Sequence, residues 1–179
     1  MNNENKKLPL VVLRSGNGSN LQASIDAVET KNLSVDIRAV ISNKKDAYGL
    51  ERAKKAGIPV EVIQHTDFDN REAFDKALID KIDQYQPGLV VLAGFMRILT
   101  EELVNHYQGR MMNIHPSLLP KFQGLNTHAR VLKENEKVHV ASVHFVTNDL
   151  ESGPLIIQAQ VPVNPNDDEK SLADAVHEQ

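Results

Sequence analysis

The sequence has no cysteine, which excludes disulfides and thiolate metal ligands and is typical of a protein from a reducing cytoplasm. It has no apolar run near the roughly 20 residues that a transmembrane helix needs. Residues 1–7 form a polar tail without the apolar core of a signal peptide. The net charge of -4, with scattered Lys and Arg, gives no surplus of positive charge for nucleic acid. We therefore expect a cytoplasmic protein whose partners are neither nucleic acids nor membranes.

Length and composition are those of an ordinary globular protein. The 179 residues include 41% hydrophobic and 25% charged side chains, enough for a substantial core. Internal repeats, low-complexity segments and linkers are not evident, so we expect one domain over residues 1–179. The seven histidines show no compact spacing of the kind that binds zinc, and we expect no metal site.

Strands and helices alternate over the first half of the chain. Short apolar runs predict strands at 8–13, 35–41, 60–63 and 89–93. Apolar residues at helical spacing predict helices that include 21–28, 47–56 and 72–85. Asp69 and Glu72 resemble the capping pair of the last of these helices. This order implies right-handed crossovers, and we predict an α/β fold: a Rossmann-like, open, mostly parallel sheet with helices on both faces.

The second half of the chain has a different rhythm. Residues 111–115, 138–146 and 155–161 are expected strands without long helices between them, so we expect the sheet to become partly antiparallel. Acidic residues 167–169 suit the start of a final helix, in which Leu172 and Val176 lie one turn apart.

Three segments directly follow predicted strands, at 16–20, 94–99 and 115–120. Ligands collect at the carboxyl ends of strands in open α/β sheets, so we expect these segments to border one cleft.

The first of these segments, Gly16-Asn17-Gly18-Ser19-Asn20, is suited to a single phosphate. Glycines allow close approach of the backbone, and the N–H groups at a helix start favour an anion. The dinucleotide fingerprint fails because Leu21 occupies the third glycine position and the second strand ends without an acidic residue. A tight turn with an ordinary helix cap is the alternative interpretation of this segment.

Asn113 and His115 form the candidate reaction centre. An extended chain places residues i and i+2 on one side, and Pro116 discourages continuation into a helix. A carboxamide donor beside an imidazole suits acyl transfer, which needs a hydrogen bond to a developing oxyanion and a group that titrates near neutrality. A structural role at the end of a strand is the alternative for each residue.

Together, these motifs resemble the glycinamide ribonucleotide formyltransferases, the folate-dependent enzymes of purine synthesis. The resemblance runs from about Leu10 to the last residue. Its most specific parts are residues 15–22, 92–99, 113–120 and 142–147. The Asn-x-His motif is shared with methionyl-tRNA formyltransferase and formyltetrahydrofolate deformylase, whereas the phosphate loop and residues 124–128 favour the glycinamide ribonucleotide branch.

The resemblance implies transfer of a formyl group from 10-formyltetrahydrofolate to the amine of phosphoribosylglycinamide, with no metal. The implied ligands of the phosphorylated substrate are Gly18, Ser19, Asn20, Leu21 and Gln22. The implied folate contacts are Arg71, Met96, Arg97, Ile98, Leu99, Asn113, Thr147, Asn148, Asp149, Leu150 and Glu151. Taken one by one, these residues also have structural interpretations: Arg71 as a solvated surface residue, Met96, Ile98 and Leu99 as core residues, and Arg97 as the partner of a carboxylate.

By the same resemblance Asn113, His115 and Glu151 are catalytic. Asn113 donates to the oxyanion, and protonated His115 supports it and delivers a proton to the leaving nitrogen. Glu151 stands where the family has an aspartate, one methylene shorter, and we expect it still to stabilise the protonated imidazole, with reduced efficiency.

Two further positions and the end of the chain depart from the family. Arg14 replaces an expected small or apolar residue, and Asn126 replaces a histidine. The chain also ends where the family continues with more helix, so we expect it to be truncated. These departures keep alternatives open: a catalytically impaired folate-binding form, or a related formyl-folate hydrolase. A nicotinamide-dependent enzyme is disfavoured by Leu21.

Overall fold

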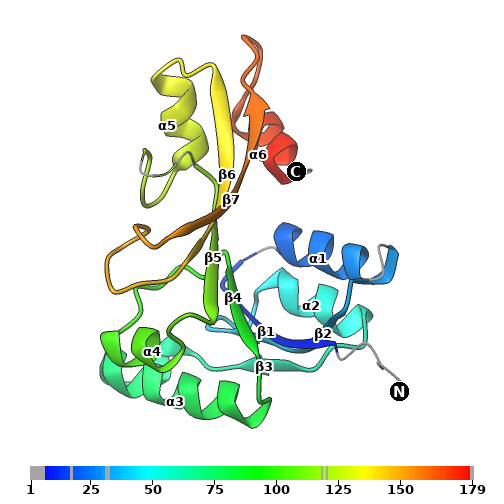
Figure 1. The fold of residues 1–179 in the computed structure, drawn as a ribbon, viewed down its shortest axis with the longest axis vertical. Coiled ribbons are helices and arrows are strands. Elements are labelled where there is room, and N and C mark those ends of the chain that lie inside the picture. The colour runs from blue at the N-terminus through cyan, green and yellow to red at the C-terminus, as the bar shows by residue number, and fades with distance from the viewer. Residues whose placement is uncertain (1–6, 17, 31–32, 118, 120, 178–179) are drawn as a thin grey trace, which may run out of the picture. The chain divides into compact units, whose positions relative to one another are not determined.

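The computed structural model describes residues 7–16, 18–30, 33–117, 119 and 121–177. The predicted polar tail, except for Lys7, lies outside these residues. The chain divides into two compact units, Met1–Met111 (unit 1) and Met112–Gln179 (unit 2), which are described separately (Figure 1). The expectation of a single domain stays a prediction. In the described part of the chain, no helix is both long and apolar enough to cross a bilayer.

Unit 1 contains a parallel sheet whose strand order is β3-β2-β1-β4. Its strands are β1 (Leu8–Arg14), β2 (Val35–Ser42), β3 (Val60–Val62) and β4 (Leu89–Ala93). Pairing of β1 with β2 and β4, and of β2 with β3, is parallel throughout. The four predicted strands of the first half and their parallel arrangement are therefore confirmed.

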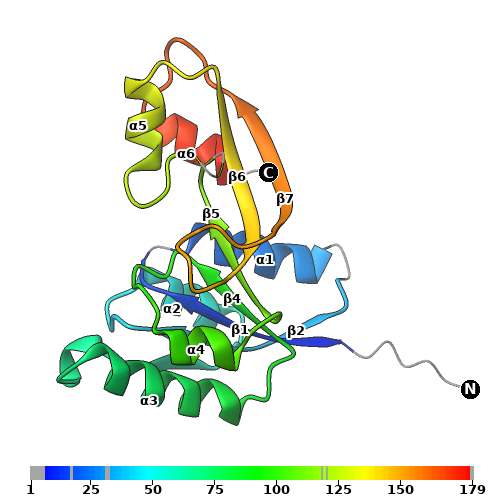
Figure 2. The same cartoon turned by 60° about the vertical axis from the view of Figure 1, so that its left-hand side comes forward.

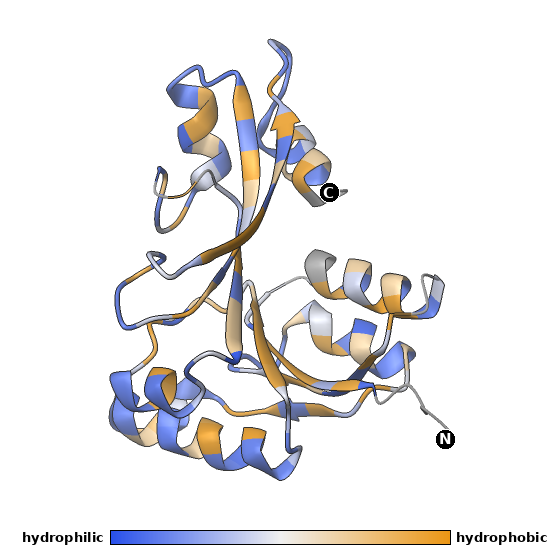
Figure 3. Ribbon diagram, in the orientation of Figure 1, coloured by the Kyte–Doolittle hydropathy of each residue, from blue (hydrophilic) through white to orange (hydrophobic). Residues whose placement is uncertain are grey.

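Helices cover both faces of this sheet, as predicted (Figures 1 and 2). The helices of unit 1 are α1 (Ser19–Thr30), α2 (Tyr48–Lys55), α3 (Arg71–Gln84) and α4 (Glu101–His106), with the short 3-10 helix η1 (His65–Asp67). The ribbon of β1, β2 and β4 is largely coloured as hydrophobic, whereas much of α3 is coloured as hydrophilic (Figure 3). Buried residues from strands and helices form the core, among them Leu13, Leu21, Ile41, Phe74 and Leu78.

Two local predictions in unit 1 need correction. The N-cap of α3 is Asn70, whose side chain accepts a hydrogen bond from the Ala73 N–H at 2.8 Å, and not the Asp69–Glu72 pair. The sequence also gave no signal for α4, a helix of 6 residues that begins at the N-cap Thr100. A helix this short lacks the repeated apolar spacing by which helices are recognised.

Unit 2 is built on antiparallel strands. Its strands are β5 (Met111–His115), which starts at the last residue of unit 1, β6 (Val138–Phe145) and β7 (Leu155–Pro162). β6 pairs antiparallel with both β5 and β7, and this confirms the expected change of strand direction.

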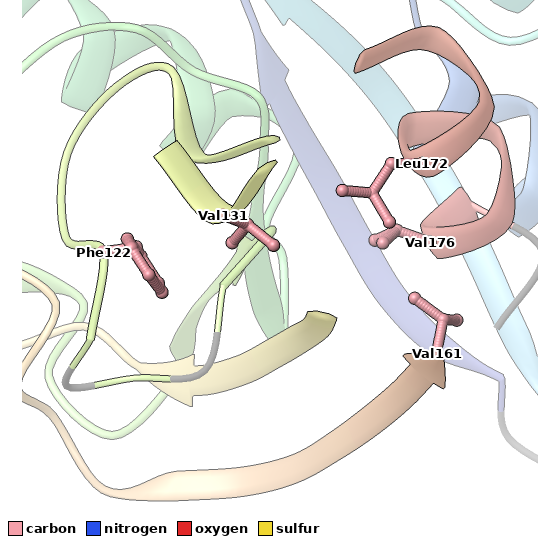
Figure 4. Packing of buried hydrophobic residues seen from close by; sticks show 5 residues of the cluster. All are labelled: Phe122, Val131, Val161, Leu172 and Val176. Carbon is pink, nitrogen blue, oxygen red and sulfur yellow. The ribbon is translucent and has the colours of Figure 1, made fainter. Parts of the chain in front are cut away.

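Helices α5 (Thr127–Lys133) and α6 (Glu169–His177) complete the core of unit 2. The predicted final helix is confirmed as α6. The buried cluster in Figure 4 joins these helices to β7 and the loop before α5; it consists of Phe122, Val131, Val161, Leu172 and Val176. Removing a large side chain from such a cluster typically costs about 2–5 kcal/mol.

Candidate active site

Asn113 and His115 lie in β5, whose antiparallel partner positions them. Asn113 is paired with His144 of β6, and His115 is paired with Ser142. Alternation along β5 places both side chains on one face, as predicted from their i, i+2 spacing. The same alternation on β6 places His144 and Ser142 beside them.

His115 is buried and makes a hydrogen bond through each ring nitrogen. Its Nδ1 lies 2.9 Å from Glu151 Oε1, and the two side chains are only 7% and 11% exposed. Its Nε2 donates to the Phe122 carbonyl oxygen at 3.1 Å. A carbonyl and a carboxylate both accept, so this environment fits the imidazolium form, in which both nitrogens are donors. The predicted proximity of Glu151 to His115 is therefore a direct contact.

Glu151 uses both of its carboxylate oxygens. While Oε1 meets His115, Oε2 accepts the Gly124 N–H at 2.9 Å. Gln123 Nε2 also donates to the Leu150 carbonyl at 3.0 Å, so the segments around 123 and 150 are held together twice. The Glu151 side chain, which is longer than the aspartate expected there, thus bridges His115 and the Gly124 N–H.

Backbone strain surrounds the same imidazole. Phe122 (φ 56°) and Glu151 (φ 50°), the two residues that contact its nitrogens, both adopt the left-handed conformation that favours glycine. The segment that carries Glu151 is closely packed, because a Cβ at Gly153 would collide with the Phe145 carbonyl oxygen. Strain of this kind persists only where surrounding contacts enforce it, and it clusters at functional sites.

His144 is a site residue that the sequence did not reveal. Its Nδ1–H donates to the Phe145 carbonyl at 2.9 Å, so its Nε2 is left as the acceptor for Asn113 Nδ2–H at 3.3 Å. This contact fixes the orientation of the Asn113 carboxamide, whose second N–H remains a donor for a ligand. The available signals were the family resemblance over residues 142–147, which assigned His144 no role, and the alternation of Ser142 and His144 on a strand whose pairing with β5 was not yet known.

A second buried network holds the turn that follows His115. The Ser142 hydroxyl donates to the Ser117 carbonyl at 2.6 Å and accepts from Gln158 Nε2 at 2.9 Å. The Ser117 hydroxyl in turn donates to the Lys121 carbonyl at 2.8 Å. Residues 118 and 120 of the predicted 115–120 segment lie outside the described residues.

His139 forms a further buried contact in unit 2. Its Nε2 lies 2.9 Å from His128 Nδ1, and its Nδ1 is buried without a hydrogen-bond partner among the described residues. Burial, followed by the neighbouring His128 and His115, lowers the pKa of His139 to about 4. This histidine is therefore neutral in the folded protein at neutral pH.

The predicted phosphate loop joins β1 to α1 in unit 1. The Gln22 N–H donates to the Gly18 carbonyl at 2.9 Å, which marks the first turn of α1. The preceding N–H groups have no acceptor within the helix, as at any helix start. Gly18 has φ +95°, so the turn requires glycine. Asn17 and the side chains of Ser19 and Asn20 lie outside the described residues.

Apart from Arg71, the predicted folate residues of unit 1 lie in the loop after β4. Ser15 anchors this loop, because its N–H donates to the Gly94 carbonyl and its hydroxyl accepts the Met96 N–H at 2.9 Å. Met96 and Ile98 are 62% and 65% exposed, so neither is a core residue. Apolar side chains held at the surface by a fixed backbone are suited to an apolar ligand.

Arg97 and Asp75 share one environment beneath this loop. The Arg97 guanidinium lies 5.1 Å from the Phe74 ring centre, and its Nε is buried without a hydrogen bond among the described residues. Asp75 accepts the Thr100 N–H at 2.6 Å. Burial raises the pKa of Asp75, against the opposing effects of Thr100, Arg97 and Arg71. The charge of Arg97 thus acts on Asp75, the carboxylate that the alternative interpretation calls for, although the two form none of the described ion pairs.

Arg71 and residues 147–150 are exposed, whereas Leu21 of the predicted phosphate site is buried in the core. Arg71 lies in the first turn of α3, and residues 147–150 form the exposed turn after β6. Within that turn the Thr147 hydroxyl donates to the Asp149 carbonyl at 3.3 Å. The structure thus joins His115 and Glu151 directly and places Asn113 on the same strand face, while the phosphate loop and the 96–99 loop belong to unit 1.

A separate cavity of about 480 Å³ in unit 1 lies between α1 and β2. Ile25, Val28 and Ile37 form part of its lining. None of the predicted site residues lines it, so this cavity is not the predicted ligand site.

Comparison with known proteins supports the same chemistry. The formyl transferase family profile matches residues 8–179. The chain is 55% identical, over 95% of its length, to phosphoribosylglycinamide formyltransferase of Escherichia coli (strain K12), of which it covers 80%. It is also 45% identical, over 97% of its length, to the trifunctional purine biosynthetic protein adenosine-3 of Homo sapiens, of which it covers 17%.

Solved structures give the same similarity in three dimensions. Phosphoribosylglycinamide formyltransferase from Coxiella burnetii matches with a TM-score of 0.91 at 55% identity, covering 96% of this chain and 81% of that one. Glycinamide ribonucleotide transformylase 1 from Symbiobacterium toebii matches with a TM-score of 0.92 at 39% identity, covering 97% and 82%. The predicted fold class is therefore confirmed beyond the strand order of unit 1.

Proposed function

The chain belongs to the formyl transferase family, and we propose that it transfers the formyl group of 10-formyltetrahydrofolate to the amine of 5'-phosphoribosylglycinamide in purine biosynthesis. The observation that carries this proposal is the buried His115–Glu151 pair on the strand that presents Asn113. Acyl transfer to an amine without a covalent enzyme intermediate requires three groups: a carboxamide donor, an imidazolium and a carboxylate.

Asn113 acts on the charge that develops at the formyl oxygen. Addition of the substrate amine to the formyl carbon turns that oxygen into an oxyanion, which the second N–H of the carboxamide stabilises. His144 keeps the donor oriented through the 3.3 Å contact to the other N–H. A donor held in place in this way typically contributes about 10²–10³ in rate.

His115 holds the proton that the reaction must deliver. As the intermediate collapses, the bond between the formyl carbon and the folate nitrogen breaks, and the leaving nitrogen takes a proton from the imidazolium. The attacking amine loses a proton to solvent or to the imidazole, so the proton count balances. Glu151 stabilises the cationic imidazole and, with the Phe122 carbonyl, fixes its orientation.

We propose that each unit carries folate contacts of its own. In unit 1 these are Arg71 and the 96–99 loop, whose exposed Met96 and Ile98 suit an apolar ring. The buried, unpartnered Nε of Arg97 among the described residues is a donor suited to a polar edge or carboxylate of that ligand. In unit 2 they are Asn113 and residues 147–151. The bound group supplies the formyl carbon that is transferred.

The substrate phosphate is proposed to bind at residues 18–22. Unsatisfied N–H groups and the positive end of the α1 dipole favour an anion there. No acidic residue stands in the first turn of α1 to oppose it.

The deciding experiment measures deformylated folate formed from 10-formyltetrahydrofolate, with and without phosphoribosylglycinamide. We expect turnover that requires the amine and that falls by about 10²-fold or more in His115→Ala. Turnover that is independent of the amine would instead identify a hydrolase. A folded protein that binds the folate without turnover would identify the catalytically impaired alternative.

A further inference from the structure

Arg14, the last residue of β1, is a buried cation at the foot of the phosphate loop. The residue is only 3% exposed. Its Nε donates to the Gly16 carbonyl at 3.2 Å, but its Nη1 is buried and has no hydrogen-bond partner in the described part of the chain. The described ion pairs do not include Arg14. A buried guanidinium in this state is costly, because it has lost water without gaining a counter-charge.

The guanidinium lies directly against the loop backbone. A Cβ built at Gly18 would lie 3.1 Å from Arg14 Nη1 and 2.8 Å from the Gly49 Cα. A Cβ at Gly49 would collide with Arg14 Nε, so α2 leaves room for the arginine by having glycine there. The unpartnered end of Arg14 therefore faces the turn that begins α1.

A second cation flanks the same turn. The Cδ of Arg52 would be 3.1 Å from a Cβ at Gly18, and its guanidinium donates to Gln22 Oε1 at 3.3 Å. Burial, followed by repulsion from Arg52, lowers the pKa of Arg14 to about 10, which leaves it charged at neutral pH. Two guanidinium charges thus meet the positive end of the α1 dipole without an acidic residue in the first turn of that helix.

We propose that Arg14 is a binding residue for the substrate's phosphate dianion, and that the bound phosphate supplies the counter-charge that Arg14 lacks inside the protein. The inference rests on the proposed assignment of residues 18–22 to that phosphate and deepens it. It adds a cation from the end of β1, at a position where the family resemblance leads us to expect a small or apolar residue. In this chain, ligand binding and fold stability are therefore coupled through one side chain.

The test uses inorganic phosphate and the full chain at pH 8, where phosphate is mainly a dianion. Calorimetric titration and thermal unfolding are compared for the unmodified protein, Arg14→Met, Arg14→Lys and the control Lys54→Met. Lys54 is an exposed lysine of α2 paired with Glu51, so the control removes a unit charge from the same helix region without touching the loop.

We expect Arg14→Met to weaken phosphate binding by about tenfold or more, since a charge close to the anion is lost. The same variant should have a higher Tm than the unmodified protein in phosphate-free buffer, because a buried unpaired charge is removed. Arg14→Lys should keep intermediate affinity, and Lys54→Met should stay within about twofold. A loss of affinity combined with a gain of stability is a signature that a purely structural arginine would not give.

Unchanged phosphate affinity in Arg14→Met overturns the inference, as does an unmodified protein that does not bind phosphate. A parallel fall of Tm and affinity would assign Arg14 a structural role instead. If Arg14→Met does not fold, Arg14→Gln removes the charge while keeping a donor and decides in the same way. Phosphate binding that depends on Arg14 without any formyl transfer would contradict the proposed function and leave this inference standing.

Discussion

Replacing Glu151 by Gln exchanges one carboxylate oxygen for an NH₂ group, and we expect this change to disable the site. Glu151 accepts from His115 through Oε1 and from the Gly124 N–H through Oε2. Gln has one acceptor oxygen and one NH₂ donor, so it cannot accept from both partners. If the Gln oxygen still accepts the Gly124 N–H, the Gln NH₂ group faces His115 Nδ1. Nδ1 must then accept a hydrogen bond, which it can do only in a neutral imidazole. The imidazole that donates to the Phe122 carbonyl through Nε2 would be held in that neutral form.

The size of the effect follows from the burial of the pair. The two side chains are 7% and 11% exposed, so solvent screens them little. Opposite unit charges at about 4 Å attract by about 4 kcal/mol at an effective dielectric constant of about 20. Loss of about 3–4 kcal/mol of transition-state stabilisation corresponds to a fall in kcat of roughly 10²–10³-fold. Glu151→Asp keeps the negative charge, and Asp adopts the left-handed backbone conformation more readily than Glu. We therefore expect this variant to retain activity within about tenfold.

The assay is the steady-state rate of amine-dependent folate release, with circular dichroism to show that each variant is folded. Glu136→Gln is the matched control in unit 2, because its carboxylate pairs with the exposed Lys121 at 3.0 Å, away from His115. In Glu151→Gln, kcat should fall by roughly 10²–10³-fold, whereas Glu136→Gln should leave kcat unchanged. A kcat of Glu151→Gln within threefold of that of the unmodified protein would refute the reasoning.

Three further changes have defined outcomes. Asn113→Ala should lower kcat by about 10²–10³-fold with little effect on thermal stability, measured by steady-state kinetics beside a melting curve. Gly153→Ala should lower the free energy of unfolding by about 2 kcal/mol or more, measured with urea, because its Cβ meets the Phe145 carbonyl. His139 should make the fold less stable in acid. Its pKa of about 4 lies below the 6.5 of a free imidazole, so the unfolded chain binds the extra proton and the free energy of unfolding falls by up to about 3 kcal/mol between these pH values.

Each of these outcomes has a result that contradicts it. Equal kcat in Asn113→Ala would remove the carboxamide from the proposed mechanism. An unchanged urea midpoint in Gly153→Ala would mean that the segment carrying Glu151 accommodates the added Cβ without a loss of unfolding free energy. For the acid effect, His139→Gln removes the titrating group, and an equally steep loss of stability between pH 6.5 and pH 4 in that variant would assign the slope to other groups.

Local sequence predicted those parts of the fold whose signals are local. Leu21 and Ile25 at helical spacing predicted α1, and both are buried in it. The N-cap of α3 was missed because Asp69 and Asn70 are both capping types, and only the backbone shows that Asn70 accepts the Ala73 N–H. The short helices α4 and α5, of 6 and 7 residues, contain too few turns for a periodic pattern.

From local pattern alone, the site could be predicted only as far as its residues share one strand, and Glu151 was reached only through the family resemblance. Asn113 and His115 were found because i, i+2 alternation is a property of the strand alone. His144 depends on the register of β5 against β6, which brings residues 31 apart into contact. The bridge from Glu151 to Gly124 likewise joins residues 27 apart. Contacts of this kind are set by tertiary packing, and no pattern within one segment encodes them.

Two departures from the family pattern, Glu151 and Arg14, are both buried charges, but they differ in where their partners lie. Glu151 has two partners inside unit 2, His115 and Gly124, so its charge is compensated in the folded protein itself. The guanidinium of Arg14 has one hydrogen bond, to Gly16, and an unpartnered buried Nη1 within the described residues. A charge compensated from within stabilises the fold at all ligand concentrations, whereas a charge compensated by a ligand makes the fold depend on that ligand. Glu151 is therefore expected to act on the rate, and Arg14 on the coupling between phosphate binding and stability.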